Sequence, residues 1–142
     1  MTKTLIVTAI HYPKISESLQ KGAISLLSDS GHKIKTIDVP GVFEIPSIVA
    51  KYINEFDAVV VLGCVIKGET SHFDLISRSV TGAIMNLSID YKKPIGNGII
   101  SCLNKQQALE RSNTTDTSKN KGVEAANAII QALNAKPTEF KC

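Results

Sequence analysis

The chain alternates short apolar runs with amphipathic segments. Four runs rich in β-branched residues occur at residues 4–10, 34–39, 57–63 and 95–102. Runs of this length that are almost continuously apolar are typical of strands buried on both faces of a parallel sheet. They predict four strands, the fourth of which is interrupted by Gly96, Asn97 and Gly98.

The segments between the runs have apolar residues at three- and four-residue spacing, which is typical of amphipathic helices. We expect helices at residues 16–30, 42–53, 72–90, 106–111 and 121–133. Ser16 can cap the first helix and Gly31 can end it, whereas Pro46 suits a first helical turn. Polar residues 112–120 predict a surface loop, and residues 134–142 predict a frayed tail.

Strands that alternate with helices predict an α/β fold. We expect one domain over residues 1–142, a flavodoxin-like three-layer αβα sandwich with a four-stranded, mostly parallel sheet. A chain of this length fits one domain and can bury a core. Ligands of such sheets bind at the carboxyl ends of the strands, so residues that follow the strands are the candidates for a site.

Composition and charge favour a soluble protein that acts on small molecules. The chain is 43% hydrophobic, has a net charge of +3 from scattered lysines, and starts without a signal-like or membrane-spanning stretch. We therefore expect a cytoplasmic protein with no membrane or nucleic-acid partner. Cys64, Cys102 and Cys142 lack metal-ligand spacing, which predicts reduced thiols and no metal.

Residues 63–74 concentrate polar side chains after the third apolar run. Gly68, Glu69 and Thr70 form a turn before the expected long helix, and small residues, hydroxyls and free N–H groups suit a phosphate. His72 lies at the helix start, where the dipole disfavours a positive charge, and a neutral imidazole can accept a proton near pH 7. The pattern alone also fits ordinary residues of a helix start.

Charged residues follow two other predicted elements. Glu44, between two apolar neighbours, is either a solvent-facing carboxylate at a helix start or an acceptor for substrate hydroxyl and N–H groups. Arg111 ends the short helix and Lys121 begins the last one. A guanidinium can bind phosphate in a bidentate manner that a lysine cannot copy, although most such surface residues are only solvated.

Four blocks of the sequence together resemble the lumazine synthase family. They are Gly-Val-Phe-Glu-Ile-Pro at 41–46, Gly-Cys-Val-Ile-Lys-Gly-Glu-Thr-Ser-His-Phe-Asp at 63–74, Gln-Ala-Leu-Glu-Arg at 107–111 and Asn-Lys-Gly at 120–122. One block would carry little weight, but four in the family's order are specific. The similarity extends over residues 5–133.

This resemblance implies a transferase of riboflavin biosynthesis. The family condenses 5-amino-6-(D-ribitylamino)uracil with 3,4-dihydroxy-2-butanone 4-phosphate and releases 6,7-dimethyl-8-ribityllumazine, phosphate and water. Members need no metal or organic cofactor. The reaction passes through an imine, loss of phosphate and ring closure, so the protein mainly has to hold two reactants together and move protons.

The resemblance also implies a role for each candidate residue. His72 corresponds to the proton-transfer histidine of the family. The residues implied to bind the ribityl chain or the pyrimidine are Val42, Phe43, Glu44, Val65, Ile66 and Lys121, the last near the ribityl or phosphate end. The residues implied to bind the phosphate are Gly68, Glu69, Thr70 and Arg111.

Two departures from the family pattern affect the expected substrate-binding residues. After the first strand, where the family usually has an aromatic residue that stacks on the pyrimidine, this chain has His11 followed by Tyr12. We expect His11 to stack and keep Tyr12 as the alternative. Where many members have Phe-Gly, this chain has Asn97-Gly98, so Asn97 joins the expected substrate-binding residues.

Members of the family are pentamers, alone or as units of larger shells, and neighbouring subunits share each active site. Shell-forming members often carry an N-terminal extension that this chain lacks, so we expect a free or paired homopentamer. The alternatives are a non-catalytic relative that binds a lumazine or flavin or acts in assembly, and a flavodoxin-like signalling or binding module. Residues 9–13 lack the clustered acids or phosphate loop that such a module needs.

Overall fold

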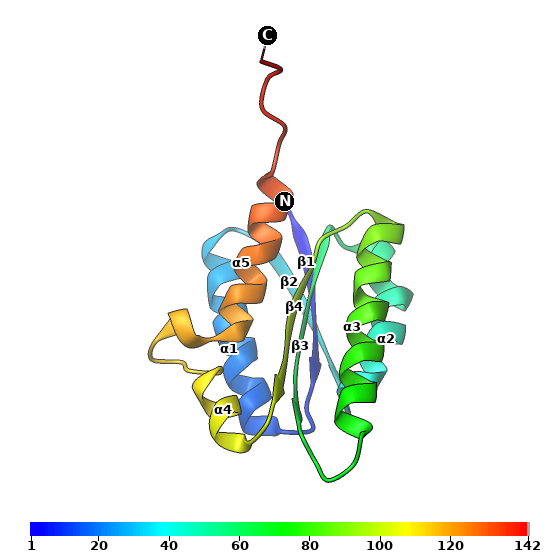
Figure 1. The fold of residues 1–142 in the computed structure, drawn as a ribbon. Coiled ribbons are helices and arrows are strands. Elements are labelled where there is room, and N and C mark those ends of the chain that lie inside the picture. Colours follow the sequence, from blue (N-terminus) through cyan, green and yellow to red (C-terminus); the bar gives the residue numbers. More distant parts are fainter. Residues whose placement is uncertain (142) are drawn as a thin grey trace.

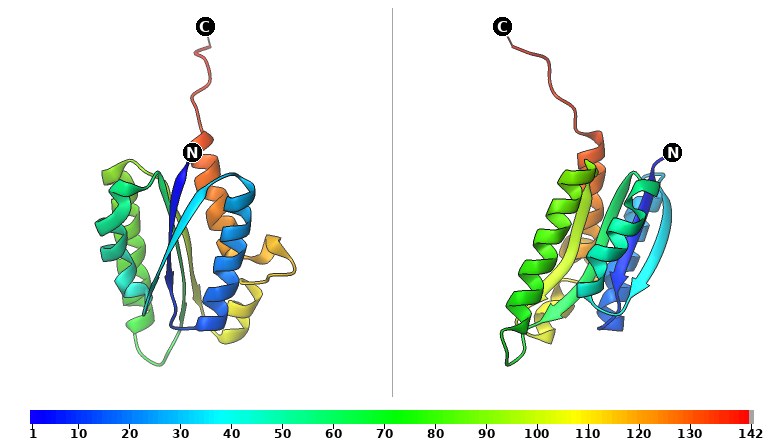
Figure 2. Two further views of the ribbon diagram at one scale, coloured as in Figure 1. Left: turned by 180° about the vertical axis from the view of Figure 1, so that it is seen from behind. Right: turned by 90° about the vertical axis from the view of Figure 1, so that its right-hand side faces the viewer.

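The computed structural model describes residues 1–141, which form three layers (Figure 1). A central sheet has α1, α4 and α5 on one face and α2 and α3 on the other, and the turned views of Figure 2 show the same separation. All strand pairs of the sheet are parallel. The expected αβα sandwich is therefore confirmed, with a sheet that is wholly rather than mostly parallel.

The four strands lie in the order β2-β1-β3-β4. Their bounds are Lys3–Ala9 for β1, Lys33–Val39 for β2, Ala58–Ile66 for β3 and Ile95–Cys102 for β4. After β1 the chain forms β2 on one side of β1, and it then forms β3 on the other side of β1. The carboxyl ends of β1 and β3 thus flank a topological switch point, where ligands of such sheets bind.

Two details of the predicted strands are wrong. The third strand does not end at Gly63 but continues to Ile66, and an added Cβ at Gly63 would lie 2.8 Å from Cγ1 of Val42. The fourth strand is not interrupted, because Gly96 and Gly98 remain in register with β3. Glycine is needed at Gly96 because α5 packs so closely that a Cβ would collide with a backbone carbonyl of that helix.

The five α-helices lie close to the predicted segments. They are α1 Pro13–Asp29, α2 Ile45–Tyr52, α3 His72–Tyr91, α4 Lys105–Glu110 and α5 Lys121–Asn134. Short 3₁₀ turns, Val42–Glu44 and Ile53–Glu55, flank α2, and a third covers Thr117–Lys119. As predicted, Pro46 lies in the first turn of α2.

The first helix begins earlier than predicted. Pro13 occupies its first turn, so Ser16 is not the cap but a buried residue within the helix. The Ser16 hydroxyl donates a hydrogen bond to the carbonyl of Ala9 at the end of β1. Gly31 follows the helix with a φ of 81°, as its predicted role at the helix end requires.

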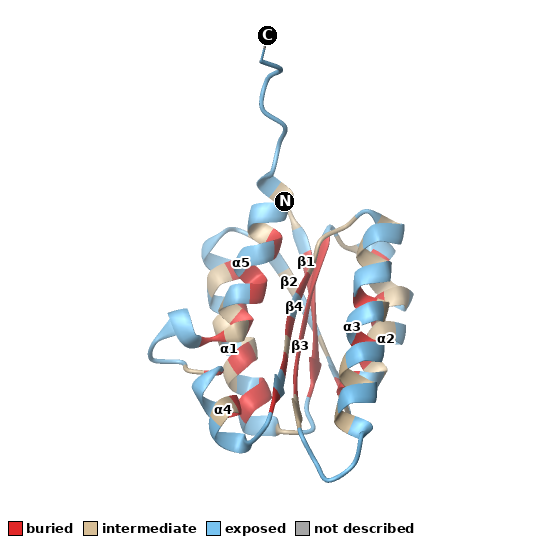
Figure 3. Cartoon of the chain, viewed as in Figure 1, coloured by how far each residue is buried: buried red, intermediate tan, exposed pale blue. Residues whose placement is uncertain are grey.

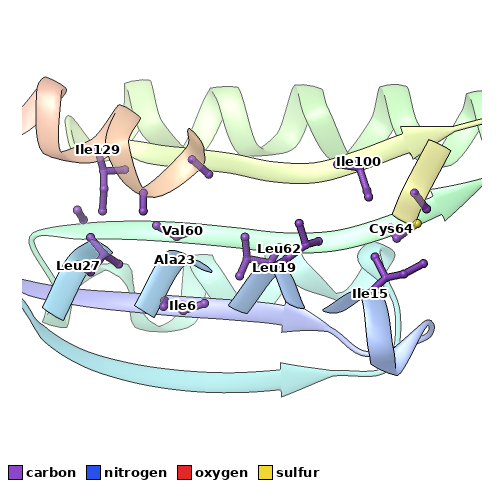
Figure 4. Packing of buried hydrophobic residues seen from close by; sticks show 14 of the residues in the cluster. Ile6, Ile15, Leu19, Ala23, Leu27, Val60, Leu62, Cys64, Ile100 and Ile129 are labelled. Carbon is purple, nitrogen blue, oxygen red and sulfur yellow. The ribbon is translucent and has the colours of Figure 1, made fainter. Parts of the chain in front are cut away.

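Buried residues are concentrated in the sheet and on the sides of the helices that face it (Figure 3). One cluster, which includes Ile6, Leu19 and Val60, packs the sheet against α1 and α5 (Figure 4). The other includes Leu5 and Ile84 and packs the opposite face against α2 and α3. The adjacent residues Leu5 and Ile6 of β1 thus contribute to opposite clusters, as expected of a strand that is covered on both faces.

The expected surface loop at residues 112–120 is exposed in its middle but buried at its ends. Ser112 and Asn120 form an antiparallel bridge, and Asn120 is only 3% exposed. The Asn120 side chain accepts N–H groups at the start of α5 and donates to the carbonyl of Ser18 in α1 at 3.1 Å. It therefore ties the loop and α5 to α1.

Residues 135–141 contain no helix or strand, are exposed, and extend away from the sheet (Figure 1). Cys142, which belongs to the predicted tail and to the predicted reduced thiols, lies outside the described residues. Within residues 1–141, no helix combines the length and the apolar character needed to cross a membrane.

Candidate functional site

The carboxyl ends of β1, β2 and β3 open into a pocket of about 530 Å³. We call it the switch-point pocket, and its lining residues are His11, Tyr12, Gly41, Val42, Phe43, Glu44, Cys64, Val65, Ile66, His72 and Ile76. They come from the segments after β1 and β2, the end of β3 and the start of α3. The volume is in the range of small-molecule sites.

Seven of the nine residues predicted to bind the ribityl chain or the pyrimidine meet in this pocket, together with His72, the predicted proton carrier. The seven are His11, Tyr12, Val42, Phe43, Glu44, Val65 and Ile66. Gly41, Cys64 and Ile76 also line the pocket and were not predicted from the sequence as site residues. Cys64 could have been found by continuing the strand past Gly63, which places it among the residues of the strand end.

His72 is the first residue of α3 and is exposed at the pocket. Its backbone N–H donates to the hydroxyl of Thr70 at 3.3 Å, which joins the helix start to the preceding turn. Gly68, Glu69 and Thr70 are exposed in the loop between β3 and α3, which projects beyond the strand ends (Figure 1). This loop does not line the pocket but leads directly to its histidine.

Glu44 is half-buried at the end of the turn that follows β2. Its Oε1 accepts the backbone N–H of Gly41 at 3.0 Å. This hydrogen bond is the capping-box contact of a glutamate at a helix start, and it holds the carboxylate at the pocket wall. Since a carboxylate has lone pairs on two oxygens, it can still accept hydrogen bonds from a ligand.

The two rings after β1 stand edge to face. The centroids of His11 and Tyr12 are 4.8 Å apart and their planes are at 87°. Tyr12 is half-buried and packs on the core cluster of the α1 face, whereas His11 is exposed. Of the two, His11 therefore has the ring that a ligand can cover more completely.

Cys64 presents a neutral thiol to the pocket. Burial, together with the neighbouring Cys102 thiol, raises the pKa of Cys64 to about 12. A thiol of this kind is not a nucleophile at neutral pH. Within residues 1–141, no three His, Cys, Asp or Glu side chains are grouped so that they could hold a metal ion.

Arg111 and Lys121 lie in a second pocket of about 750 Å³, which we call the α5 pocket. Its lining residues are Ile99, Ile100, Ser101, Glu110, Arg111, Asn113, Ser118, Lys119, Asn120, Lys121 and Glu124. The backbone N–H of Lys121 donates to the carbonyl of Arg111 at 2.8 Å, which joins the backbones of the two residues. The Lys121 ammonium pairs with Glu124 at 2.9 Å.

The two pockets have no lining residue in common, so a single chain does not bring Arg111 or Lys121 to His72. Asn97 lies in neither pocket. It is the third residue of β4, is exposed, and its Oδ1 accepts the backbone N–H of Ile99 at 3.0 Å. The predicted substrate-binding set is therefore divided between separate parts of the surface.

The sequence is similar to known proteins over almost its whole length. A family model described as 6,7-dimethyl-8-ribityllumazine synthase matches residues 1–137. A protein of that name from Bartonella tribocorum is 43% identical over 135 residues, which cover 93% of this chain and 88% of the relative. Another from Zymomonas mobilis subsp. mobilis is 41% identical over 138 residues, which cover 96% of this chain and 97% of the relative.

Proposed function

Because the chain belongs to the 6,7-dimethyl-8-ribityllumazine synthase family, we propose that it is a transferase of riboflavin biosynthesis. It condenses 5-amino-6-(D-ribitylamino)uracil with 3,4-dihydroxy-2-butanone 4-phosphate and releases 6,7-dimethyl-8-ribityllumazine, phosphate and water. The observation that carries this proposal is the switch-point pocket, which combines a ring, a fixed carboxylate and a histidine from three separate segments.

The end of β3 supports binding of the pyrimidine. β1 pairs with β3 only as far as Leu62, whereas β4 pairs as far as Ile66. One edge of the last β3 residues is therefore not paired in the sheet, and its backbone groups need partners. A pyrimidinedione offers alternating N–H and C=O groups that can bind such an edge, with Val65 and Ile66 beside the ring and His11 stacked on it.

The turn after β2 is suited to the ribityl chain. Glu44 is fixed by its hydrogen bond to Gly41 and can accept hydrogen bonds from ribityl hydroxyls. Val42 and Phe43 form the wall beside it. Since this turn follows a different strand from the one that holds the pyrimidine, the two ends of the substrate are positioned independently.

His72 and the loop before it support proton transfer and phosphate binding. Imine formation and loss of phosphate both require protons to move, and an imidazole exposed at the pocket can accept and donate them. Gly68, Glu69 and Thr70 offer N–H groups and a hydroxyl at the start of a long helix, where an anion is favoured. No step needs a metal or an organic cofactor.

We propose that the cations come from a neighbouring copy in a cytoplasmic homopentamer. Arg111 and Lys121 do not line the switch-point pocket, so a second chain has to supply them if they bind this substrate. One side of α3 also exposes Leu75, Met85 and Ile89, which are 62%, 58% and 63% exposed. Apolar residues on one side of a helix are typical of helix–helix contacts, here with further copies.

Mixing the purified protein with both substrates tests the proposal directly. We expect 6,7-dimethyl-8-ribityllumazine, followed by its absorbance, to form much faster than in buffer. Formation at the uncatalysed rate would contradict the proposed activity. Binding of a ribityl-pyrimidine analogue without turnover would favour the alternative of a non-catalytic relative.

A further inference from the structure

A buried cysteine lies behind the arginine of the α5 pocket. Cys102 is the last residue of β4 and is 0% exposed. Its sulfur lies 3.6 Å from Nη1 of Arg111, and the same nitrogen donates to the carbonyl of Ser101 at 3.3 Å. Both contacts use one nitrogen of the guanidinium, which has two others that carry N–H groups.

The cysteine on the neighbouring strand β3, Cys64, is neutral and does not attract the Arg111 guanidinium as a thiolate would. Cys64 lies on β3, beside the end of β4, and belongs to the same core cluster. The raised pKa of Cys64 keeps its thiol neutral at neutral pH. The Arg111 guanidinium contacts the sulfur of Cys102 and the carbonyl of Ser101, both on β4.

We propose that Cys102 is a positioning residue for Arg111 in the binding of the butanone phosphate. Together with the carbonyl of Ser101, it holds Nη1 and so fixes the plane of the guanidinium, whose remaining N–H groups serve the phosphate. This inference rests on the proposed role of Arg111 as a phosphate ligand. It adds a residue that itself touches no substrate.

The physical reason is preorganisation. A guanidinium binds a phosphate best through two parallel N–H groups, which requires a defined orientation of the whole side chain. A side chain already held in that orientation loses less rotamer freedom when the ligand binds. Because a thiol sulfur is a weak acceptor, the effect on binding is modest and concerns only the substrate that carries the phosphate.

The test compares Cys102→Ala with Cys102→Ser, which have nearly the same volume but differ in the acceptor. For Cys102→Ala we expect the KM for 3,4-dihydroxy-2-butanone 4-phosphate to rise about three- to tenfold, the effect of losing one weak acceptor of the guanidinium. The KM for the pyrimidine substrate and kcat stay unchanged. Cys102→Ser, which retains an acceptor, restores most of the affinity.

Three further variants make the result decisive. Val59→Ala removes buried volume at the other end of β3 and should leave both KM values unchanged. Cys102→Val, which is close to cysteine in shape and has no acceptor, replaces Cys102→Ala if that variant does not fold. In an Arg111→Ala background, Cys102→Ala should cause no additional rise in KM, because its effect acts through the guanidinium.

Two outcomes separate this inference from the proposed function. If Arg111→Ala leaves the KM for the phosphate substrate unchanged, the phosphate-binding role of Arg111 is wrong. If Arg111→Ala raises that KM but Cys102→Ala and Cys102→Ser behave alike, the positioning role of Cys102 is wrong and the role of Arg111 stands.

Discussion

Glu44 follows β2 and His72 follows β3, the two strands on either side of β1, and both residues line the switch-point pocket. Each residue takes part in one local hydrogen bond. The backbone N–H of His72 donates to the hydroxyl of Thr70, and the backbone N–H of Gly41 donates to the carboxylate of Glu44. These bonds hold the backbone of His72 and one carboxylate oxygen of Glu44 in place. The imidazole and the other carboxylate oxygen can still contact a ligand. The proposed chemistry at the residue scale thus combines a fixed acceptor with an exposed proton carrier.

Replacement of His72 tests the proton carrier. For His72→Ala we expect kcat to fall about a hundredfold, the usual contribution of a positioned acid or base, while the KM for the phosphate substrate changes little. Steady-state kinetics with both substrates measure this, and circular dichroism confirms the fold. A kcat close to that of the unchanged protein would remove His72 from its assigned role.

His32 offers a pH-dependent test away from the pocket. Its Nδ1 lies 2.8 Å from the hydroxyl of the buried Thr4, and burial lowers the pKa of His32 below its usual 6.5, although the carboxylate of Asp57 opposes the shift. A lowered pKa in the folded state contributes stability above pH 6.5, and this is lost as the pH falls through the folded-state pKa.

The unfolding free energy should therefore fall on acidification by more in the unchanged protein than in His32→Asn. Denaturant titrations above and below pH 6.5 measure this difference, and an NMR titration gives the pKa of the ring directly. A His32 pKa above 6.5 in the folded protein would contradict the proposed effect of burial.

At the scale of elements, the close approach of α5 to its neighbours determines several details. A Cβ at Gly122 would collide with the carbonyl of Leu19 in α1, and one at Gly96 would collide with a carbonyl of α5. Asn120 closes the same junction by capping α5 and bonding to α1. The helix α5, which begins with Lys121, is therefore fixed by close contacts with α1 and β4.

Gly122→Ala tests this packing. Because the added methyl group meets backbone rather than a movable side chain, we expect the free energy of unfolding to fall by about 1–3 kcal/mol. Denaturant unfolding measures the change. Asn127→Ala, at an exposed position of the same helix, is the control and should change stability by less than about 0.5 kcal/mol. Equal effects of the two substitutions would contradict the inferred contact.

These contacts also mark the limit of what the sequence could predict about the fold. Hydrophobic periodicity located every strand and α-helix, because it reports which side of an element is buried. It could not show that Gly63 and Gly96 lie within strands, since both positions are determined by elements packed against them. The prediction of Ser16 as a cap failed for a similar reason. Its hydroxyl donates to the carbonyl of Ala9 in β1, a tertiary contact that periodicity does not report.

At the scale of the whole molecule, the predicted site residues lie in two separate pockets, and one side of α3 exposes apolar residues. The resemblance named eight of the eleven lining residues of the switch-point pocket, but only Arg111 and Lys121 of the α5 pocket. A linear sequence also does not show which of the named residues one chain can bring together. The structure divides them into a group around His72 and a group around Arg111. In a closed ring of copies, one surface of each copy contacts a different surface of the next copy. Such a contact would bring the His72 group of one copy to the Arg111 group of its neighbour.

The exposed side of α3 tests assembly separately from catalysis. Ile89→Lys places a charge among the exposed apolar residues of α3, so we expect smaller particles, while the helical content stays unchanged. Light scattering should give the mass of five 15.3 kDa chains for the unchanged protein. A mass near a megadalton would indicate a shell, and a monomer would contradict the proposed oligomer.

The most direct test of a catalytic site shared between copies mixes two impaired variants, assayed at a concentration of the phosphate substrate well below the KM of Arg111→Ala. His72→Ala and Arg111→Ala are unfolded separately, combined in equal amounts and refolded together. If each site takes His72 from one chain and Arg111 from its neighbour, random assembly leaves about a quarter of the sites intact and restores about that share of the activity. Activity no higher than that of the separately refolded variants would contradict a shared site.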